Sequence, residues 1–398
     1  MAVDVDTLHG DDDLHAAGAL FRAAMVGLPP LPPHRDHLSE PGRTLGVRID
    51  GRLVGTAESY TSWLVVPGGA RVAHAAVTHV GVLPTHTRRG VLTALLRRQL
   101  DDIAERGEVV ATLRASEGSI YERFGYGVAS SFARLDLRRG RARLRDTVPP
   151  SGPVRFVEPA DAWKLFPQIY ASAAISWTGA IDRPDYWWKL KERTAAEPVY
   201  TVTHGPIGAE DGFARYHPVD TANWFTSRER TIVVDDLVAT TPQAYLGLIR
   251  HLLAVDLVDK VTFAFAPVDA PLRHLFADER AVEVAGVHDE TWLRLVDVPT
   301  ALARRTYRDG PPVIIEVDDP IRTANTGRYR IHADEITRVD DPADVSVDVA
   351  TLGAIYLGGS TWRQLAFAGR VVEHRAGAVD AADNLFATPN LPFSGTFF

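Results

Sequence analysis

The sequence has no cysteine among its 398 residues. This absence excludes disulfide bonds, zinc sites built from thiolates and catalysis by a cysteine nucleophile. No apolar run reaches about 18 residues, so we expect no membrane-spanning helix. The first residues, Met1 to Asp13, are acidic and lack the basic and apolar regions of a secretory signal peptide. We therefore expect a cytoplasmic protein.

Positive charge is also scarce. The 43 lysine and arginine residues are outnumbered by 51 aspartate and glutamate residues, which gives a formal net charge of −8. A dedicated nucleic-acid-binding protein normally presents a basic face, so this class is disfavoured. The acidic balance suits a cationic or neutral small substrate. With 45% apolar and 24% charged residues the composition is that of a globular protein, and the length predicts two or three domains of about 150 residues each.

The first third of the chain alternates helix and strand signals. Asp50-Gly51 fits a tight type I′ turn, which predicts a hairpin of Thr44–Ile49 and Arg52–Thr56. Leucines at helical spacing and alternating apolar residues predict the other elements. These are helices at Leu14–Val26, Gly90–Ile103 and Ser119–Phe124, strands at Val72–Val82, Val109–Leu113 and Arg134–Leu137, and an exposed linker at Arg138–Arg145.

The middle third repeats this order more weakly. A strand, a helix, a strand and a short helix are expected at Ile232–Leu237, Gln243–Val255, Lys260–Ala266 and Pro271–Phe276. Val109 and Val261 occupy equivalent places in the two copies. Recurrence at about one domain length predicts two related α/β domains in tandem.

The last third begins near Trp292. Strands are predicted at Val313–Val317, Gly327–His332 and Asp344–Val349, and short helices at Thr351–Tyr356 and Trp362–Ala366. The tail from Leu391 to Phe398 is apolar on both sides of a Ser394-Gly395 turn. We expect this tail to fold back and to bury Phe397 and Phe398, because such an end is unlike the polar, mobile ends of most chains.

The segment most informative about function is Val80–Leu92, which follows a predicted strand and opens a predicted helix. Such a junction offers unpaired backbone N–H groups and the positive end of a helix dipole, which suits a pyrophosphate. Arg88 and Arg89 add positive charge, and Gly90 removes a side chain where the backbone must approach the phosphates. The same residues could instead form a plain loop that carries a solvated arginine pair.

A second segment, Leu113–Tyr126, helps to decide between a phosphate-binding junction and a plain loop at Val80–Leu92. Together the two segments resemble the GNAT family of acetyl-CoA-dependent N-acetyltransferases. In that family an Arg/Gln-x-x-Gly-x-Gly/Ala turn holds the coenzyme A pyrophosphate, and a later Tyr-x-x-x-Gly-Phe/Tyr segment supplies the general acid. Tyr121 and Gly125 match the second pattern, whereas Thr87 and Leu92 depart from the first.

Within the GNATs, the chain resembles the Eis (enhanced intracellular survival) family. The matching motifs are Arg88-Arg89-Gly90-Val91 followed by Leu92, Pro84-Thr85-His86, and Ser116-Glu117-Gly118. The resemblance implies an α/β (α+β) fold with a catalytic GNAT domain at residues 1–150, a second GNAT-like domain at 151–290 and a sterol-carrier-like domain at 291–398. It also implies a homohexamer that uses acetyl-CoA to acetylate amines of aminoglycosides or polyamine-like substrates.

The resemblance further assigns roles to individual residues. Tyr121 matches the general acid, and the terminal carboxylate of Phe398 matches the general base, with Glu58 or His79 as the next candidates. The residues expected at the coenzyme are Val80, Gly81, Val82, Arg88, Arg89, Gly90, Val91, Leu92, Thr93, Ser116 and Glu117, and no metal is expected. Val80 and Val82 could instead be core residues, and Ser116 could be a helix cap.

The second copy of the repeat lacks these features. Ala239–Tyr245 stands where the first copy has Pro84–Gly90, and it contains neither an arginine pair nor a glycine. Pro271–Phe276 has no tyrosine at the matching place. We therefore expect the second domain to be structural, or to wall the substrate cleft, without a coenzyme site.

Other residues allow more than one interpretation. His74, His79 and His86 could contact substrate or be ordinary core and surface histidines. Trp187 and Trp188 could line a sugar-binding cleft or belong to a core. For the whole chain, the alternatives to an Eis-type enzyme are a GNAT acting on protein lysines or N-termini, and a lipid carrier or scaffold in which the GNAT site is vestigial.

Overall fold

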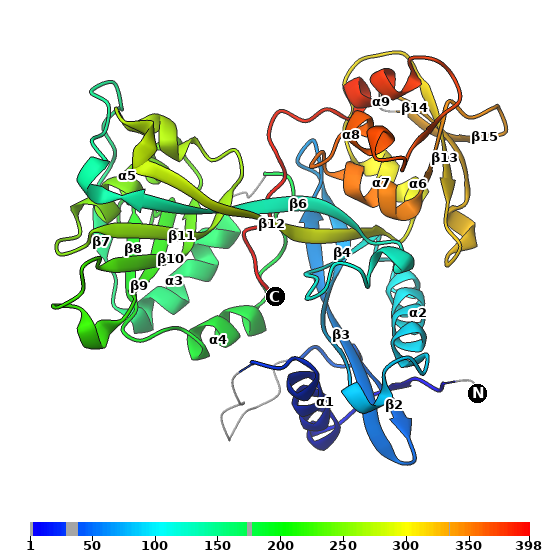
Figure 1. Cartoon of the computed structure of the whole chain (residues 1–398), viewed down its shortest axis with the longest axis horizontal. Helices are drawn as coiled ribbons and strands as arrows, with labels where there is room; N and C mark the ends of the chain where they lie inside the picture. Colours follow the sequence, from blue (N-terminus) through cyan, green and yellow to red (C-terminus); the bar gives the residue numbers. More distant parts are fainter. Residues whose placement is uncertain (1–2, 29–38, 173–176, 334) are drawn as a thin grey trace. The chain divides into compact units, whose positions relative to one another are not determined.

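The computed structural model describes residues 3–28, 39–172, 177–333 and 335–398. The chain divides into two compact units, of which unit 1 comprises residues 1–130 and 290–398, and unit 2 comprises residues 131–289. Figure 1 shows the helices and strands of both units, with labels where there is room. Both are mixed α/β, as the sequence predicts. Across the described part of the chain, no helix is both long and apolar enough to cross a membrane.

The main sheet of unit 1 has the strand order β1-β2-β3-β4-β5-β12. Its strands are β1 (Asp6–Thr7), β2 (Thr44–Ile49), β3 (Arg52–Val65), β4 (Arg71–Val82), β5 (Val110–Leu113) and β12 (Val282–Leu295), the last of which enters unit 1 at Glu290. Neighbours pair antiparallel except β4 and β5, which are parallel. The predicted hairpin is confirmed, and Asp50 and Gly51 both have the positive φ of a type I′ turn.

Two helices cover opposite faces of this sheet (Figure 1). They are α1 (Asp11–Ala24) and α2 (Val91–Glu105). A Cβ at Gly55 would collide with Val91 of α2, and one at Gly81 would lie only 3.2 Å from the Cβ of Ala24 in α1. These two glycines therefore allow both helices to lie close to the strands. Leu95, Leu96 and Leu100 of α2 are buried, as their helical spacing predicts, and Leu92 in the first turn is partly buried.

The link between β5 and the next strand differs from the sequence prediction. A short helix is expected at Ser119–Phe124, but the structure has turns followed by a single 3-10 turn, η2 (Glu122–Phe124). Gly125 closes it with a φ of 83°, as expected for a glycine at a helix end. The following strand β6 (Gly127–Arg138) is much longer than the predicted strand Arg134–Leu137.

The rest of unit 1 is a five-stranded sheet in the order β15-β14-β13-β16-β17 with four helices. The elements are β13 (Val313–Asp318), β14 (Gly327–His332), β15 (Glu335–Val339), β16 (Val345–Asp348), β17 (Val372–Glu373), α6 (Val298–Arg304), α7 (Val349–Tyr356), α8 (Trp362–Phe367) and α9 (Ala378–Phe386). Trp292, near which the last third was predicted to begin, lies in β12 and pairs with Leu113 of β5. A Cβ at Gly127 would collide with the backbone of Ala350 in α7, so this helix packs tightly on β6.

Unit 2 is built on a sheet with the strand order β6-β11-β10-β9-β8-β7. Its other strands and helices are β7 (Val154–Phe156), β8 (Tyr200–His204), β9 (Gly212–Pro218), β10 (Thr231–Ala239), β11 (Lys260–Pro267), α3 (Pro159–Ser172), α4 (Asp185–Arg193), α5 (Pro242–Ala254) and the 3-10 helices η3 (Arg139–Arg141), η4 (Thr221–Asn223), η5 (Pro271–Leu275) and η6 (Glu279–Ala281). Only β10 and β11 are parallel neighbours here. The order β10–α5–β11–η5 therefore repeats the order β4–α2–β5–η2 of unit 1.

The expected linker at Arg138–Arg145 is wrong in one respect. Several of its side chains are exposed, but its backbone is fixed against unit 2. Arg139 donates hydrogen bonds to the carbonyl oxygens of Leu253 and Val258, and the backbone N–H of Arg145 donates to Leu275. Arginine density indicated exposure correctly, but it could not reveal the carbonyl groups that these side chains reach.

Candidate active site

Strand β4 carries a β-bulge near its C-terminal end. His79 and Val80 together lie opposite the single residue Ala57 of β3. His79 takes a φ of 50°, in the left-handed region. A bulge kinks its strand and redirects the side chains and backbone groups that follow it. The last residues of β4 are therefore turned relative to its first half.

The neighbouring strand β5 leaves β4 before this bulge is reached. The parallel pairing runs from His74 with Val110 to Val77 with Leu113, where β5 ends. The remaining part of β4, residues 78–82, keeps β3 on one side. Its other edge faces a cavity, so the backbone of this edge can pair with an extended ligand.

This cavity has a volume of about 1150 Å³. It is bounded by the end of α1, the end of β4, the turn before α2, the first turn of α2 and the segment after β5. The lining residues are Ala24, Met25, Val26, Gly27, Leu28, Val80, Gly81, Val82, His86, Thr87, Arg88, Gly90, Val91, Leu92, Thr93, Ser116, Glu117, Ile120, Tyr121 and Arg123. All the residues proposed for the coenzyme lie here except Arg89, and Tyr121 lies beside them.

The first turn of α2 points its backbone N–H groups into this cavity. Gly90 is the residue before the helix, with φ 81° and ψ 0°, and no side chain caps the N–H groups that follow. Within the protein a Cβ at Gly90 would meet nothing within 4 Å, so it is the left-handed φ that requires glycine. Val91, Leu92 and Thr93 thus present unpaired N–H groups at the positive end of a helix dipole.

The two arginines before α2 differ in their relation to the cavity. Both are exposed, and neither has an ion-pair partner among the residues that the structure describes. Arg88 lines the cavity and has a φ of 61°. Arg89 does not line it. A single unpaired guanidinium therefore accompanies the helix N-terminus, an arrangement that binds phosphate.

Tyr121 forms part of the cavity wall and is 5% exposed. Burial raises the pKa of its phenol to about 12, because an ionised phenolate would lose its hydration there. The phenol is consequently protonated at neutral pH and can donate a proton. Ser116, which could have been a helix cap, caps no helix and lines the cavity instead.

A buried ion pair supports the turn that carries Tyr121. Arg294 of β12 is fully buried and contacts both carboxylate oxygens of Asp319 at 2.7 and 2.6 Å. A Cβ at Gly125 would lie 2.7 Å from Nε of Arg294, so the turn rests directly on this guanidinium. Asp319 follows β13 of the five-stranded sheet. That sheet therefore holds the arginine beneath the tyrosine turn.

The chain end is held by polar contacts. Residues 391–398 form neither helix nor strand (Figure 1). Ser394 and Thr396 are buried, and Gly395 between them has a φ of 65°, but residues 394–395 do not form the hydrogen-bonded turn that the sequence predicts. The expected burial of Phe397 is wrong, because this side chain is 51% exposed. Phe398 is partly buried, and its ring packs edge-on against Tyr60 of β3 at 5.7 Å between centroids.

The three histidines near β4 have different surroundings. His74 is fully buried, its Nε2 lies 2.7 Å from the hydroxyl of Thr112, and burial with the charge of Arg43 lowers its pKa to about 3. It is a neutral core residue and cannot contact substrate. His79 is 2.7 Å from the carboxylate of Glu58, and His86 lines the cavity.

The equivalent place in unit 2 has a different chemistry. A cavity of about 470 Å³ lies at the end of β10 and the start of α5. Its lining consists of Ala239, Thr240, Thr241, Pro242, Tyr245, Leu246, Pro271 and Leu275, and it holds no charged residue. Thr241 caps α5 by accepting a hydrogen bond from the N–H of Ala244. Trp187 and Trp188 are each 5% exposed and belong to the core of unit 2, so they line no open cleft.

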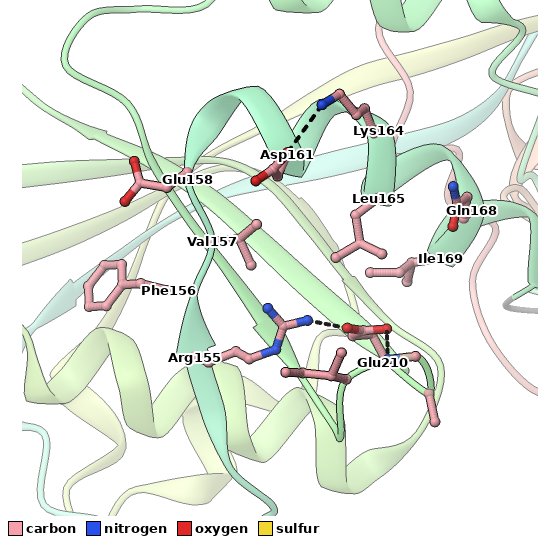
Figure 2. Close-up of a pocket in the computed structure, with 13 residues that line it drawn as sticks. Arg155, Phe156, Val157, Glu158, Asp161, Lys164, Leu165, Gln168, Ile169 and Glu210 are labelled. Atoms are coloured by element: carbon pink, nitrogen blue, oxygen red, sulfur yellow. Dashed lines mark hydrogen bonds and ion pairs between the residues drawn. The ribbon is translucent and has the colours of Figure 1, made fainter.

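A further cavity of about 790 Å³ in unit 2 is lined by β7, α3 and residues 207–210, which connect β8 to β9. Figure 2 shows Arg155 of β7 directed at Glu210, with which it forms an ion pair, and Lys164 directed at Asp161. Both cations in its wall are already paired, and Glu158 adds a further carboxylate. Phosphate groups would meet negative charge here, which favours the cavity of unit 1 as the coenzyme site.

Sequence reasoning missed two groups of residues at the site. The end of α1 and the residues after it, Ala24 to Leu28, line the cavity without any motif. Arg114 and Glu290 contact the chain end, and only Arg114 had a local signal, as a charged residue directly after a buried strand. Among the described residues, no group of three or more histidine, aspartate or glutamate side chains could hold a metal ion.

Comparison with known proteins agrees with this arrangement. Acetyltransferase (GNAT) domain families match residues 7–129 and 179–295, and a sterol carrier protein domain family matches residues 298–395. The chain is an N-acetyltransferase of the GNAT class, built from two GNAT domains followed by a sterol-carrier-like domain.

Its relatives define the family more narrowly. The chain is 33% identical to the N-acetyltransferase Eis of Mycobacterium tuberculosis, over 86% of this chain and 85% of that protein. It is 37% identical to an uncharacterised N-acetyltransferase of Streptomyces avermitilis, over 89% of each. The crystal structure of Eis1 from Mycobacterium abscessus superposes with a TM-score of 0.93 at 51% identity, covering 100% of both chains. The chain therefore belongs to the Eis family of N-acetyltransferases.

Proposed function

We propose that this enzyme transfers the acetyl group of acetyl-CoA to amines of aminoglycoside or polyamine-like substrates. The observation that carries the proposal is the 1150 Å³ cavity of unit 1. There an unpaired strand edge, a helix N-terminus with one unpaired arginine and a buried protonated tyrosine line a single space. Each of these features matches one part of a thioester coenzyme and its reaction.

The coenzyme would extend along β4 into the first turn of α2. Its amide-containing arm would pair with the open edge of β4 at Val80 to Val82, as an additional strand. Its pyrophosphate would lie on the N–H groups of Val91, Leu92 and Thr93, with Arg88 beside it. Ser116 and Glu117 would border the arm from the segment after β5. Arg89 would add charge from outside the cavity.

The reaction needs three proton transfers. The substrate ammonium gives one proton to a base, because only a neutral amine has a lone pair for attack. The nitrogen then attacks the thioester carbon, the C–S bond breaks, and the thiolate takes the phenol proton of Tyr121. The proton lost by the new amide nitrogen returns through solvent to Tyr121. Backbone N–H groups of the β4 edge would stabilise the oxyanion.

For the base we propose the terminal carboxylate of Phe398. Phe398 packs on Tyr60 of β3, and the preceding residues are held by buried contacts, so this end of the chain is fixed. The competing base is the pair of Glu58 and His79 at the β4 bulge, 2.7 Å apart. A fixed carboxylate would also attract a cationic substrate, in keeping with the net charge of −8.

The three domains would have different roles, and the chain would form an oligomer. We assign catalysis to residues 1–150, a supporting role without coenzyme to residues 151–290, and the sterol-carrier-like domain to residues 291–398. We also propose a homohexamer of the 43.5 kDa chain. Light scattering should then give about six chain masses, and a monomer at micromolar concentration would contradict the hexamer.

Calorimetric titration with acetyl-CoA tests the proposed function. We expect one equivalent to bind per chain, and mass spectrometry of an incubated aminoglycoside should show added acetyl groups. Two bound equivalents would contradict the absence of a coenzyme site in the second GNAT domain. Absence of binding would contradict the assignment of the unit 1 cavity.

A further inference from the structure

A buried polar cluster lies next to the proposed coenzyme cavity without being part of it. Arg114 directly follows β5, and Glu290 lies in β12, two residues before Trp292, which pairs with the end of β5. The two side chains form an ion pair with 3.1 Å between Nη2 and Oε1. Their side chains are only 8% and 0% exposed. Nothing in the proposed chemistry of acetyl transfer uses either of them.

Glu290 accepts hydrogen bonds from four donors. Its Oε2 lies 2.8 Å from the hydroxyl of Ser130 in β6 and 2.8 Å from the backbone N–H of Ser394. Its Oε1 lies 2.9 Å from the N–H of Gly395 and also accepts from Arg114. Two of the four donors are therefore backbone groups of the C-terminal tail. A buried carboxylate requires such partners, and only an ionised one can accept from all four.

Arg114 holds the next residue of the tail. Its Nε and Nη2 lie 3.0 and 2.6 Å from the carbonyl oxygen of Thr396. The guanidinium also lies 5.2 Å from the ring centroid of Phe397. Thus Glu290 binds the N–H groups of two tail residues, and Arg114 binds the carbonyl group of a third. Only two residues separate the last of these contacts from the terminal carboxylate.

Apolar burial explains the position of this tail only in part, because Pro392 is buried and Phe398 packs on Tyr60. Phe397 is half exposed, and the segment has no helix or sheet hydrogen bonds to fix it. Chain ends without such restraints are ordinarily mobile. The ion pair supplies the restraint, since releasing the tail would leave N–H, carbonyl and carboxylate groups without partners in a buried place.

We propose that Arg114 and Glu290 are positioning residues that hold the terminal carboxylate of Phe398 in place for proton transfer. This inference rests on the proposed function, in which that carboxylate is the base. The two residues do not touch substrate in this account. They act on the reaction only through the tail.

The test uses the full-length chain carrying Glu290→Gln, with Arg114→Lys as a second variant. Glutamine keeps the size of the side chain but turns one acceptor into a donor facing other donors. Lysine keeps the charge but loses the planar fork that reaches Thr396 with two nitrogens. Glu108→Gln is the control, because Glu108 forms a similarly buried ion pair with Arg43, whose other side-chain contacts are to Glu40, Ser59 and Thr61 and not to residues 394–396.

The first readout is the rate at which carboxypeptidase A removes Phe398 from the folded protein. We expect Glu290→Gln to raise this rate at least tenfold, Arg114→Lys to raise it less, and Glu108→Gln to leave it near that of the parent. The second readout is steady-state turnover. We expect Glu290→Gln to lower kcat about tenfold or more with little change in the KM for acetyl-CoA.

A double variant that combines Glu290→Gln with deletion of Phe398 distinguishes the positioning role of Glu290 from the role of the Phe398 carboxylate as base. In the deleted protein, Glu290→Gln should have no further effect on kcat, because the carboxylate through which it acts is gone. If Glu290→Gln lowers kcat by the same factor in both backgrounds, or if no variant changes the carboxypeptidase rate, the positioning role is overturned. If the Phe398 deletion itself retains parental turnover, the proposed base is wrong instead.

Discussion

The guanidinium of Arg114 donates two hydrogen bonds, at 3.0 and 2.6 Å, to the carbonyl oxygen of Thr396, two residues before the end of the chain. Arg114 stands only two positions before Ser116, which lines the cavity proposed for acetyl-CoA. The segment that leaves β5 thus serves both the coenzyme cavity and the chain end. Residues 114–116 therefore contact both the chain end, which carries the proposed base, and the cavity proposed for the thioester.

Deletion of Phe398 should abolish most turnover while acetyl-CoA binding persists. General base catalysis contributes about 10²- to 10⁴-fold, so we expect a loss of at least about 100-fold in kcat. Phe398→Leu is the control, because it keeps the terminal carboxylate and should retain much of the activity. Full turnover in a C-terminally extended protein would exclude the terminus and would favour Glu58 and His79.

Arg88→Ala should weaken acetyl-CoA binding more than Arg89→Ala does. Arg88 lines the cavity and Arg89 does not. Loss of a charge-assisted contact to phosphate is expected to raise the dissociation constant about tenfold for Arg88→Ala, against about threefold or less for Arg89→Ala. Isothermal titration calorimetry measures both. Equal effects, or none, would place the pyrophosphate elsewhere.

Tyr121→Phe should lower kcat by about 100-fold and leave acetyl-CoA affinity nearly unchanged. The pKa of about 12 for this buried phenol keeps it protonated through the neutral and mildly alkaline range. The parent enzyme should therefore show no loss of kcat from ionisation of Tyr121 up to about pH 10. Phenylalanine retaining parental kcat would show that the thiolate leaves without this acid.

Asp319→Ala should destabilise the protein and loosen the turn that carries Tyr121. Removing the carboxylate leaves the buried Arg294 without its ion-pair partner, with one hydrogen bond to the carbonyl oxygen of Leu295, and such a loss typically costs about 3 kcal/mol or more in free energy of unfolding. Amide exchange at Gly125 and Tyr126 should accelerate in the folded state. The control is Asp380→Ala, which breaks an ion pair whose two side chains are 70% exposed and should cost less than about 1 kcal/mol. Similar losses in both variants would contradict the supporting role of Arg294.

His74 should make stability fall as the pH drops below about 6.5. Its folded-state pKa of about 3 lies below the ordinary value of 6.5, so between these values only the unfolded chain binds the proton. The contribution to the slope is about 1.4 kcal/mol per pH unit in that window. Denaturant unfolding of His74→Gln should show a correspondingly flatter curve from pH 6.5 towards pH 4. Parallel curves across this range would show that His74 accepts a proton in the folded protein.

Local patterns predicted the parts of the structure that local chemistry determines. The Asp50-Gly51 hairpin, the amphipathic helix α2 and the glycine before it follow from turn geometry and residue spacing within a few positions. The paired domain order followed from the recurrence of strand, helix and strand. The residues proposed for the coenzyme, except Arg89, line one cavity, and most of them belong to a strand, a turn and a helix that are consecutive in the chain.

Contacts between distant segments were not predictable in this way. Arg114 meets Glu290, and Arg294 meets Asp319 under Gly125, only because β12 returns to lie beside β5. Neither residue pair has a spacing that signals contact. The contacts of the tail were not predictable for the same reason. Its two terminal phenylalanines suggested apolar burial, whereas Phe397 is half exposed and the buried backbone of Ser394 to Thr396 makes polar contacts with distant residues.

Amine-dependent release of free thiol from acetyl-CoA is the measurement that tests the central claim most directly. The full-length enzyme would be given acetyl-CoA with aminoglycosides, polyamines and lysine-containing peptides in parallel. We predict saturable thiol release with aminoglycosides or polyamines that exceeds release with the peptides, together with the acetylated amine as product. Absence of amine-dependent release with any aminoglycoside or polyamine, from an enzyme that is folded and binds acetyl-CoA, would contradict the proposed function.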